Sequence, residues 1–357
     1  MIRQRRSIEE LPRYSQGKSD AGAIKLSSNE SPFPPLPAVV DALGALTSSL
    51  HLYPEIAATA LIAKLAERFG VGPDEIALGS GSAEVVSQLI TASAGEGDEI
   101  IFAWRSFEAY PRMVRIAGAT PVPVPLTEDG RHDLPAMAAA VTDRTRLILV
   151  CSPNNPTGTS VTKEELDSFL HSVPRDVLVV IDEAYVHFNN DAHAADGLDF
   201  FRRYENVAVL HTFSKAYGLA GLRIGYAIAP EQVVANLRRV ALPFGVTALA
   251  QKAAVVSLDA EAELRERVDY VIAERSRVAE ALRDAGWRAF DSFGNFIWLC
   301  TGEQTALVDQ QLQERGVIAR AFAGEGIRVT IGSSEMNDVF LAAVRTLSTS
   351  GVLATTE

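Results

Sequence analysis

The stretch between residues 147 and 210 carries three short apolar runs, LILVC at 147–151, VLVVI at 177–181 and VAVL at 207–210. Continuous runs rich in β-branched residues are typical of strands that are covered on both faces of a sheet. The segment 162–173 between the first two runs has apolar residues at helical spacing, so the pattern predicts a βαβ unit. A fourth run, IGYAIA at 224–229, completes the pattern of a mostly parallel α/β sheet.

The rest of the chain divides into parts that flank this sheet. The proline-rich elbow at 31–37 excludes a helix or a central strand, and we interpret it as the link between an N-terminal arm, residues 1–40, and a large domain, residues 41–255. A long amphipathic helix is predicted over 262–285. We therefore expect a smaller α+β domain over 256–357, joined by the arm. Its predicted strands lie at 296–299 and 327–331.

Composition and charge narrow the class of protein. The 357 residues are 47% hydrophobic and 22% charged, which is typical of a globular protein of about two domains. With 33 basic and 45 acidic residues the net charge is −12, which argues against a nucleic-acid binder that uses a basic surface. No run approaches the ~18 apolar residues of a membrane span, and no apolar segment follows the basic residues 1–6, as a secretory signal requires.

The cysteines and histidines of the sequence indicate a cytoplasmic protein without a metal site. Cys151 and Cys300 are too few for a disulfide framework, and the six histidines show no metal-ligand spacing. Without a histidine motif beside it, Cys151 is expected to be a buried thiol and not a nucleophile. His211 is expected to have a packing or solvent-facing role. We therefore expect a soluble cytoplasmic protein.

Polar motifs follow three of the predicted strands. They read SPNNPTG at 152–158, DEAY at 182–185 and HTFSK at 211–215, and the last continues into AYGLAGLR at 216–223. Because ligands of open α/β sheets bind beyond the carboxyl ends of the strands, we expect these motifs to meet in one crevice.

The residue types in these motifs satisfy the requirements of pyridoxal phosphate chemistry. Lys215 can form an imine with the aldehyde of that cofactor, and Asp182 can keep its ring nitrogen protonated. Asn155 and Tyr185 can donate hydrogen bonds to its phenolate oxygen.

The phosphate of the same cofactor needs hydroxyls, a cation and backbone N–H groups. Thr212, Ser214 and Arg223 supply the first two, and the turn GSGSAE at 79–84 supplies N–H groups at a predicted helix start. This turn does not match the fingerprint of a nicotinamide dehydrogenase, because Glu84 stands where the third glycine is required.

The run TFSKAYGLAGLRIG at 212–225 resembles the lysine motif of the fold-type I, class II pyridoxal-phosphate aminotransferases. The resemblance covers nearly the whole chain. It extends through 25–30, 53–54, the NPTG turn at 155–158, 182–185 and 326–332. Within the class, the chain resembles the histidinol-phosphate aminotransferase branch, and in particular the aromatic (phenylalanine) aminotransferases of actinobacteria, in which a stretch like WRSF at 104–107 recurs.

The resemblance implies an architecture and a set of roles. It implies a large domain with a mostly parallel seven-stranded sheet, a smaller α+β domain, and a homodimer with shared active sites. It also implies that Lys215, Asp182 and Tyr185 are catalytic, with Lys215 moving a proton between the substrate Cα and the cofactor. The resemblance further implies that Phe107 stacks on the cofactor ring and that Asn155 and Tyr185 bind its ring oxygen. The phosphate is expected to be bound by the amides of Ser82 and Ala83 and by Thr212, Ser214 and Arg223. Tyr53 is expected to contact the phosphate in the neighbouring subunit. Arg328 is expected to bind the substrate α-carboxylate, with Asn29 beside it.

Substrate choice depends on fewer residues. Tyr14 and Arg320 match positions that bind the phosphate of histidinol phosphate in that branch, whereas Phe107 and Phe244 stand where tyrosines are common. The loss of two hydroxyls leaves an apolar wall that favours a phenyl side chain. The sequence thus favours transamination of phenylalanine, tyrosine or tryptophan with 2-oxoglutarate, and the alternative is histidinol-phosphate transamination.

Two further classes stay open at this point. One is a pyridoxal-phosphate decarboxylase on the same scaffold, and the other is a non-catalytic protein that keeps the fold. The intact set of Lys215, Asp182 and Arg223 argues against the second.

Overall fold

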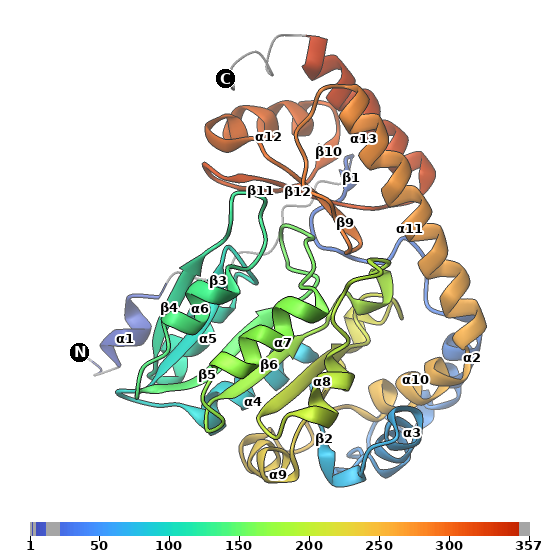
Figure 1. Ribbon diagram of the computed structural model, residues 1–357. Helices are drawn as coiled ribbons and strands as arrows, with labels where there is room; N and C mark the ends of the chain where they lie inside the picture. The colour runs from blue at the N-terminus through green and yellow to red at the C-terminus, as the bar shows by residue number, and fades with distance from the viewer. Residues whose placement is uncertain (1, 3–4, 12–21, 350–357) are drawn as a thin grey trace.

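The computed structural model describes residues 2, 5–11 and 22–349, and its centre is a seven-stranded sheet (Figure 1). The strand order is β2-β8-β7-β6-β5-β3-β4. The bounds are β2 Ile76–Gly79, β3 Glu99–Trp104, β4 Thr120–Pro125, β5 Thr145–Cys151, β6 Leu178–Asp182, β7 Val207–Thr212 and β8 Gly225–Ile228. Strand β8 is antiparallel to both neighbours, and the other neighbouring strands are parallel. The predicted mostly parallel α/β sheet is therefore confirmed.

Helices cover both faces of this sheet because its central strands are apolar on both sides. In β5, Leu147 and Leu149 belong to one core cluster, whereas Ile148 and Val150 belong to another. The first cluster is closed by α4 Ser82–Ser93, α5 Tyr110–Ala117 and α9 Glu231–Val240. The second is closed by α6 Leu134–Ala139, α7 Lys163–Ser172 and α8 Gly197–Arg203. Continuous apolar runs correctly predicted strands buried in the middle layer of three.

A second group of helices lies at the β2 edge of the sheet. Helix α10, Ala248–Asp259, packs against α2, Pro37–Ala45, and α3, Thr59–Phe69. The elbow at 31–37 was expected to be free of helix, and this is wrong for Pro37, which begins α2. Proline is tolerated in the first turn of a helix because the N–H that it lacks has no intrahelical partner there.

The C-terminal part is built around a long helix and a small sheet. Helix α11, Glu261–Asp284, runs along the right edge of Figure 1 in orange and connects α10 to this part. The small antiparallel sheet has the order β11-β12-β9. Its bounds are β9 Phe296–Leu299, β11 Arg320–Phe322 and β12 Gly326–Thr330, and the adjoining elements are α12 Thr305–Glu314, β10 Val317–Ile318 and α13 Ser334–Thr349.

The N-terminal segment contributes to the C-terminal part. Strand β1, Ile24–Lys25, pairs in parallel with β10, and the short helix α1 covers Arg6–Glu9. One apolar core includes Leu61 of α3, Leu258 of α10, Val271 of α11 and Phe296 of β9, so packing is continuous between the two parts of the chain. The division into domains at residues 40 and 255 stays a prediction.

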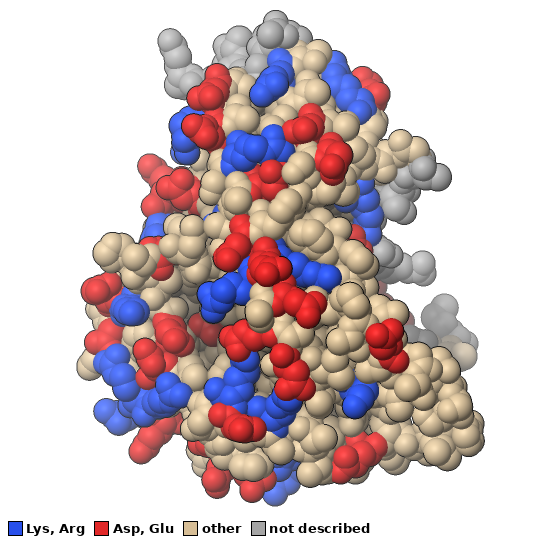
Figure 2. Space-filling view, turned by 90° about the vertical axis from the view of Figure 1, so that its right-hand side faces the viewer, with Lys and Arg blue, Asp and Glu red and all other residues tan. Residues whose placement is uncertain are grey.

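The surface carries charges of both signs. Figure 2 shows Lys and Arg mixed with Asp and Glu over most of one face, without a broad basic area. Among the described residues, no helix has the length and apolarity that crossing a membrane requires. The same part of the chain holds no group of three or more side chains suited to bind a metal ion.

Candidate active site

A cavity of about 480 Å³ lies beyond the carboxyl ends of β5, β6 and β7. It is lined by every predicted site residue except Tyr14 and Tyr53. These are Asn29, Ser82, Ala83, Phe107, Asn155, Asp182, Tyr185, Thr212, Ser214, Lys215, Arg223, Arg320 and Arg328. Tyr14 lies outside the described residues. Tyr53 is 82% exposed and lies outside this cavity.

Lys215 follows β7 and projects into the cavity. Its Nζ donates to the backbone carbonyl oxygens of Asn29, at 3.2 Å, and Ser28, at 3.4 Å. Burial lowers the pKa of Lys215 to about 7, and the positive charges of Arg328 and Arg223 act in the same direction against the opposing effect of Glu30. At neutral pH, a large fraction of this amine is therefore unprotonated and nucleophilic.

Asp182 ends β6 and is held by a residue that sequence reasoning missed. The hydroxyl of Tyr110, at the start of α5, donates to Asp182 Oδ2 at 2.5 Å, and the backbone N–H of Ala184 donates to Oδ1 at 3.2 Å. Burial raises the pKa of Asp182, whereas the hydrogen bond from Tyr110 lowers it. A buried carboxylate at the wall of a cavity favours a cationic ligand atom beside it.

The start of α4, Arg223 and Ser214 form an anion-binding cradle in the same cavity. Helix α4 begins at Ser82, so its first backbone N–H groups have no intrahelical partner. Arg223 Nη1 donates to Ser214 Oγ at 3.4 Å and to the Ala220 carbonyl at 3.0 Å. Gly81 has a positive φ of 83°, and a Cβ there would lie 2.3 Å from Arg223 Nη2. Glycine thus leaves room for a guanidinium beside a helix start, a combination that suits a phosphate group.

Arg328, on β12, brings a cation from the C-terminal part into the cavity. Its Nη1 donates to Asn155 Oδ1 at 2.6 Å, and its Nη2 donates to the Ser27 carbonyl at 2.7 Å. Asn29 lines the same cavity, and its Nδ2 donates to the Tyr185 hydroxyl at 2.9 Å. In this structure the amide oxygen of Asn155 therefore accepts from Arg328, and the expected contact of Asn155 with a cofactor ring stays a prediction.

The remaining wall of the cavity contains an ion pair that the sequence did not reveal. Arg320 donates to the carboxylate of Glu108, with Nη2 2.9 Å from Oε1 and Nε 3.2 Å from Oε2. Phe107, the neighbour of Glu108, packs edge-on against Tyr110 with ring centroids 5.4 Å apart. Phe244 was expected to contribute to an aromatic wall, but it does not line this cavity. It stacks on Tyr53 with ring centroids 4.6 Å apart, because the segment after α9 leads away from the crevice.

Cys151 and His211, to which the sequence gives no catalytic role, are both buried. Cys151 is 2% exposed, and burial raises the pKa of its thiol far above neutrality, so it is not a nucleophile at physiological pH. His211 lies between Glu183 Oε2, at 2.7 Å from Nε2, and the Tyr226 hydroxyl, at 3.0 Å from Nδ1. Its packing role is confirmed, and a solvent-facing position is excluded.

The chain is similar to known proteins over most of its length. The family described as "Aminotransferase class I and II" matches residues 21–344. An aromatic amino acid aminotransferase of Streptomyces coelicolor is 55% identical over 341 residues, which are 94% of this chain and 95% of that one. An aromatic amino acid aminotransferase of Cutibacterium acnes is 53% identical over 338 residues, 94% of this chain and 96% of that one.

Among solved structures, the histidinol-phosphate aminotransferase of Sinorhizobium meliloti in complex with pyridoxal-5′-phosphate has a TM-score of 0.89 at 25% identity, over 98% of both chains. A tetra mutant of Thermus thermophilus aspartate aminotransferase has a TM-score of 0.84 at 25% identity, over 99% of this chain and 100% of that one.

If the cradle binds the phosphate, alanine substitutions at two nearby glycines should differ in their effect on the affinity for pyridoxal phosphate. In Gly225→Ala, the new Cβ would lie 2.4 Å from the backbone nitrogen of Ser82 and would displace the start of α4, which forms part of the cradle. Overpacking of this kind costs about 1–3 kcal/mol, so we expect the Kd for pyridoxal phosphate to rise roughly tenfold or more. Gly221→Ala is the matched control, because a Cβ at Gly221 meets nothing within 4 Å. Fluorescence titration of both variants, with melting curves, tests this, and wild-type affinity in Gly225→Ala would refute the role of the cradle.

The pKa of Lys215 predicts a pH dependence. With a pKa of about 7, the amine is mostly protonated well below this pH and mostly a neutral nucleophile well above it. We expect covalent uptake of pyridoxal phosphate by the cofactor-free protein to accelerate between about pH 6 and 8 and then to level off, well below the ordinary titration range of lysine. Stopped-flow absorbance measures this rate, with N-acetyl-lysine as the control for the titration of the cofactor itself. A rate that still rose with pH above about 9 would contradict the lowered pKa.

Proposed function

The chain belongs to the class I and II aminotransferases, and we propose that its amino donors are aromatic amino acids and that 2-oxoglutarate is the acceptor. The observation that carries this proposal is the identity of 53–55% to relatives named aromatic amino acid aminotransferase, over 94% of this chain. The products would be aromatic 2-oxo acids and glutamate.

The residues of the cavity fit pyridoxal phosphate, the cofactor of this family. Asp182 is a buried carboxylate suited to a protonated ring nitrogen, and the start of α4 with Ser214 and Arg223 suits the phosphate. Lys215 supplies the amine that would bind the aldehyde. When bound, this cofactor takes up the amino group of the substrate and draws electrons from its Cα.

Three side chains of the protein would move the proton, bind the substrate and hold the cofactor-binding carboxylate. Lys215 Nζ would accept a proton from the substrate Cα and pass it to the cofactor carbon that receives the amino group, a task suited to an amine whose pKa is about 7. Arg328 would bind the α-carboxylate of donor and acceptor through its planar guanidinium. Tyr110 would hold Asp182 in its ionised form, because its hydroxyl donates to Oδ2.

A donor comparison tests this function. The two half-reactions of a transaminase are separable, so each amino compound can be mixed with the cofactor-loaded protein without an acceptor. We expect phenylalanine and tyrosine to convert the cofactor from its aldehyde to its amine form, as measured by absorbance, and 2-oxoglutarate to reverse the change. Conversion by histidinol phosphate alone would refute the aromatic assignment, and release of carbon dioxide without an acceptor would indicate a decarboxylase.

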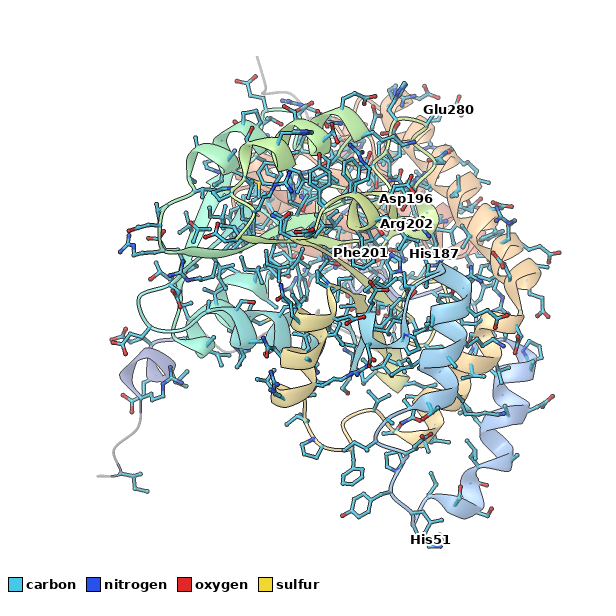
Figure 3. The ribbon with its side chains drawn as sticks, turned by 60° about the horizontal axis from the view of Figure 1, so that its bottom comes forward. His51, His187, Asp196, Phe201, Arg202 and Glu280 are labelled. Carbon is cyan, nitrogen blue, oxygen red and sulfur yellow. The ribbon has the colours of Figure 1, made fainter. Side chains whose placement is uncertain are left out.

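We also propose that the enzyme is a homodimer, since a contiguous apolar surface is exposed. Leu52, Tyr53 and Ile56 are each more than 60% exposed, and Tyr53 stacks on Phe244 from a distant segment. Figure 3 shows His51 at the tip of the same segment, at the lower edge of the molecule. Monomeric proteins rarely expose apolar patches of this kind.

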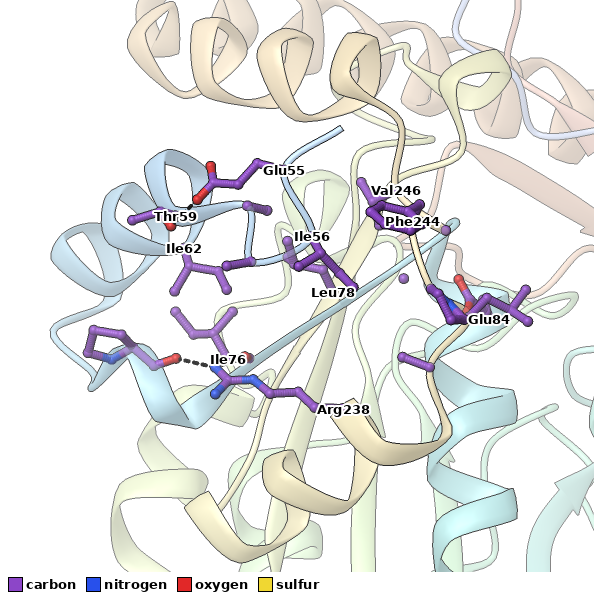
Figure 4. A pocket seen from close by; sticks show the side chains of 18 of the residues that line it. Glu55, Ile56, Thr59, Ile62, Ile76, Leu78, Glu84, Arg238, Phe244 and Val246 are labelled. Carbon is purple, nitrogen blue, oxygen red and sulfur yellow. Dashed lines mark hydrogen bonds between the residues drawn. The ribbon is translucent and has the colours of Figure 1, made fainter. Parts of the chain in front are cut away.

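A cavity beside this surface supports the same proposal. It measures about 630 Å³ and is larger than the candidate active site, but no lysine lines it, and most of its lining residues are apolar, such as Ile56, Leu78 and Phe244 (Figure 4). It adjoins the anion cradle, because Glu84 lines this cavity whereas Ser82 and Ala83 line the other. A second copy seated here would lie close to the phosphate site, where the resemblance expects Tyr53 of the partner subunit.

The free thiols of the chain are consistent with a reducing compartment. Cys151 and Cys300 are both unpaired, which suits a reducing compartment. We propose that the enzyme is cytoplasmic.

If the exposed apolar surface around Ile56 is the dimer interface, a charge placed there should prevent dimer formation. Ile56→Glu places a carboxylate in the proposed interface, and we expect the mass in sedimentation velocity to halve at micromolar concentration because burying an unpaired charge is costly. Leu307→Glu is the matched control, since Leu307 is an exposed leucine on α12, away from this surface. A wild-type protein that sedimented as a monomer would exclude the homodimer.

A further inference from the structure

Two arginines stand side by side on the small sheet. Arg320 of β11 is paired in register with Arg328 of β12. Residues directly opposite each other in an antiparallel pair project to the same face of the sheet, and both arginines line the candidate active site. Two adjacent guanidinium groups would suit a dianion such as a phosphate monoester.

Glu108 changes the charge of this arrangement. It lies in the loop between β3 and α5, and its carboxylate binds the Nε and Nη2 edge of Arg320. The pair is partly enclosed, with 18% of the Arg320 side chain and 28% of the Glu108 side chain exposed. The three side chains Glu108, Arg320 and Arg328 therefore carry a net charge of +1.

A net charge of +1 matches a carboxylate better than a phosphate ester. An amino acid carries a singly charged carboxylate on Cα, whereas histidinol phosphate carries a phosphorylated hydroxymethyl group in that place. A phosphate ester bears roughly −1.5 to −2 at pH 7, so it gains from two free guanidiniums and is repelled by a carboxylate beside them.

We propose that Glu108 is a specificity-determining residue, which selects substrates with an α-carboxylate against amino alcohol phosphates by occupying Arg320. This inference rests on the proposed function, because it explains why an aromatic amino acid is preferred to histidinol phosphate. Glu108 acts as a repulsive element for the wrong anion, while Arg328 remains the attractive element for the correct one.

The chain offers a matched control in a second ion pair. Arg105 and Glu325 join the same loop to the turn after β11, with Nε and Oε2 2.9 Å apart. Neither residue lines the candidate active site. Loss of this pair weakens the same contact between the two parts of the chain without changing the charge that faces the substrate.

The test compares Glu108→Gln with Glu325→Gln and the wild type, all loaded with cofactor. Two unreactive ligands share a phenylethyl group, and 3-phenylpropanoate ends in a carboxylate whereas 3-phenylpropyl phosphate ends in a phosphorylated hydroxymethyl group. Calorimetry gives both Kd values. In Glu108→Gln we expect the preference for the phosphate over the carboxylate to rise about tenfold, as removal of one nearby unit charge implies. The ratio of half-reaction rate constants for histidinol phosphate and phenylalanine should rise in parallel.

Three outcomes separate the proposals. An unchanged ratio in Glu108→Gln, in a protein whose wild type reacts with phenylalanine, overturns the role of Glu108 and leaves the proposed function standing. An equal rise in Glu325→Gln also overturns it, because the effect would then come from the contact between the two parts of the chain. A further substitution, Arg320→Gln in the Glu108→Gln background, should cancel the gain. A wild type that reacts only with histidinol phosphate contradicts the proposed function itself.

Discussion

The structure depends on two groups of opposite charge that are buried at one edge of the sheet. Asp182 ends β6 and Lys215 follows β7. Burial raises the pKa of Asp182 and lowers the pKa of Lys215, so both shifts favour the uncharged form of the group. Such groups cost stability unless a partner compensates them. Tyr110 compensates the carboxylate in part, and a cofactor with a cationic ring and a reactive aldehyde would complement both. The pair of buried groups therefore suits a ligand such as pyridoxal phosphate, which presents a cationic ring nitrogen to Asp182 and an aldehyde to Lys215.

The site is assembled from three separate stretches of the chain. The large sheet supplies Lys215 and Asp182, the segment after β1 supplies Asn29, and the small sheet supplies Arg328. Asn29 links two of these stretches, since its Nδ2 donates to Tyr185 while its backbone N–H donates to Thr330 Oγ1. The guanidinium that would hold the substrate is thus fixed relative to the amine that would move its proton, which is the positional accuracy that catalysis requires.

Much of the fold and the cofactor side of the site could be predicted from the sequence, because their signals are local. Apolar runs end within two residues of the ends of the observed strands, and the polar motifs at 152–158, 182–185 and 211–215 begin at those strand ends. On the substrate side, Asn29, Arg320 and Arg328 could be named from the sequence and line the cavity. The pairs that hold the site could not be predicted, because they join residues far apart in the chain. Glu108 and Arg320 are 212 positions apart, and Tyr110 and Asp182 are 72 apart. Nothing in the neighbouring sequence marks Glu108 as the partner of an arginine, and Phe244 looked like a wall residue until the path of its segment was known.

The central claim is that Lys215 forms the covalent bond to the cofactor, and peptide mapping after borohydride reduction tests it most directly. Protein loaded with pyridoxal phosphate would be reduced, digested and analysed by mass spectrometry. The account predicts that the pyridoxyl mass is found on the peptide containing Lys215, and that it is lost from this peptide in Lys215→Ala. An adduct confined to exposed lysines, or a colourless protein without any adduct, would contradict it.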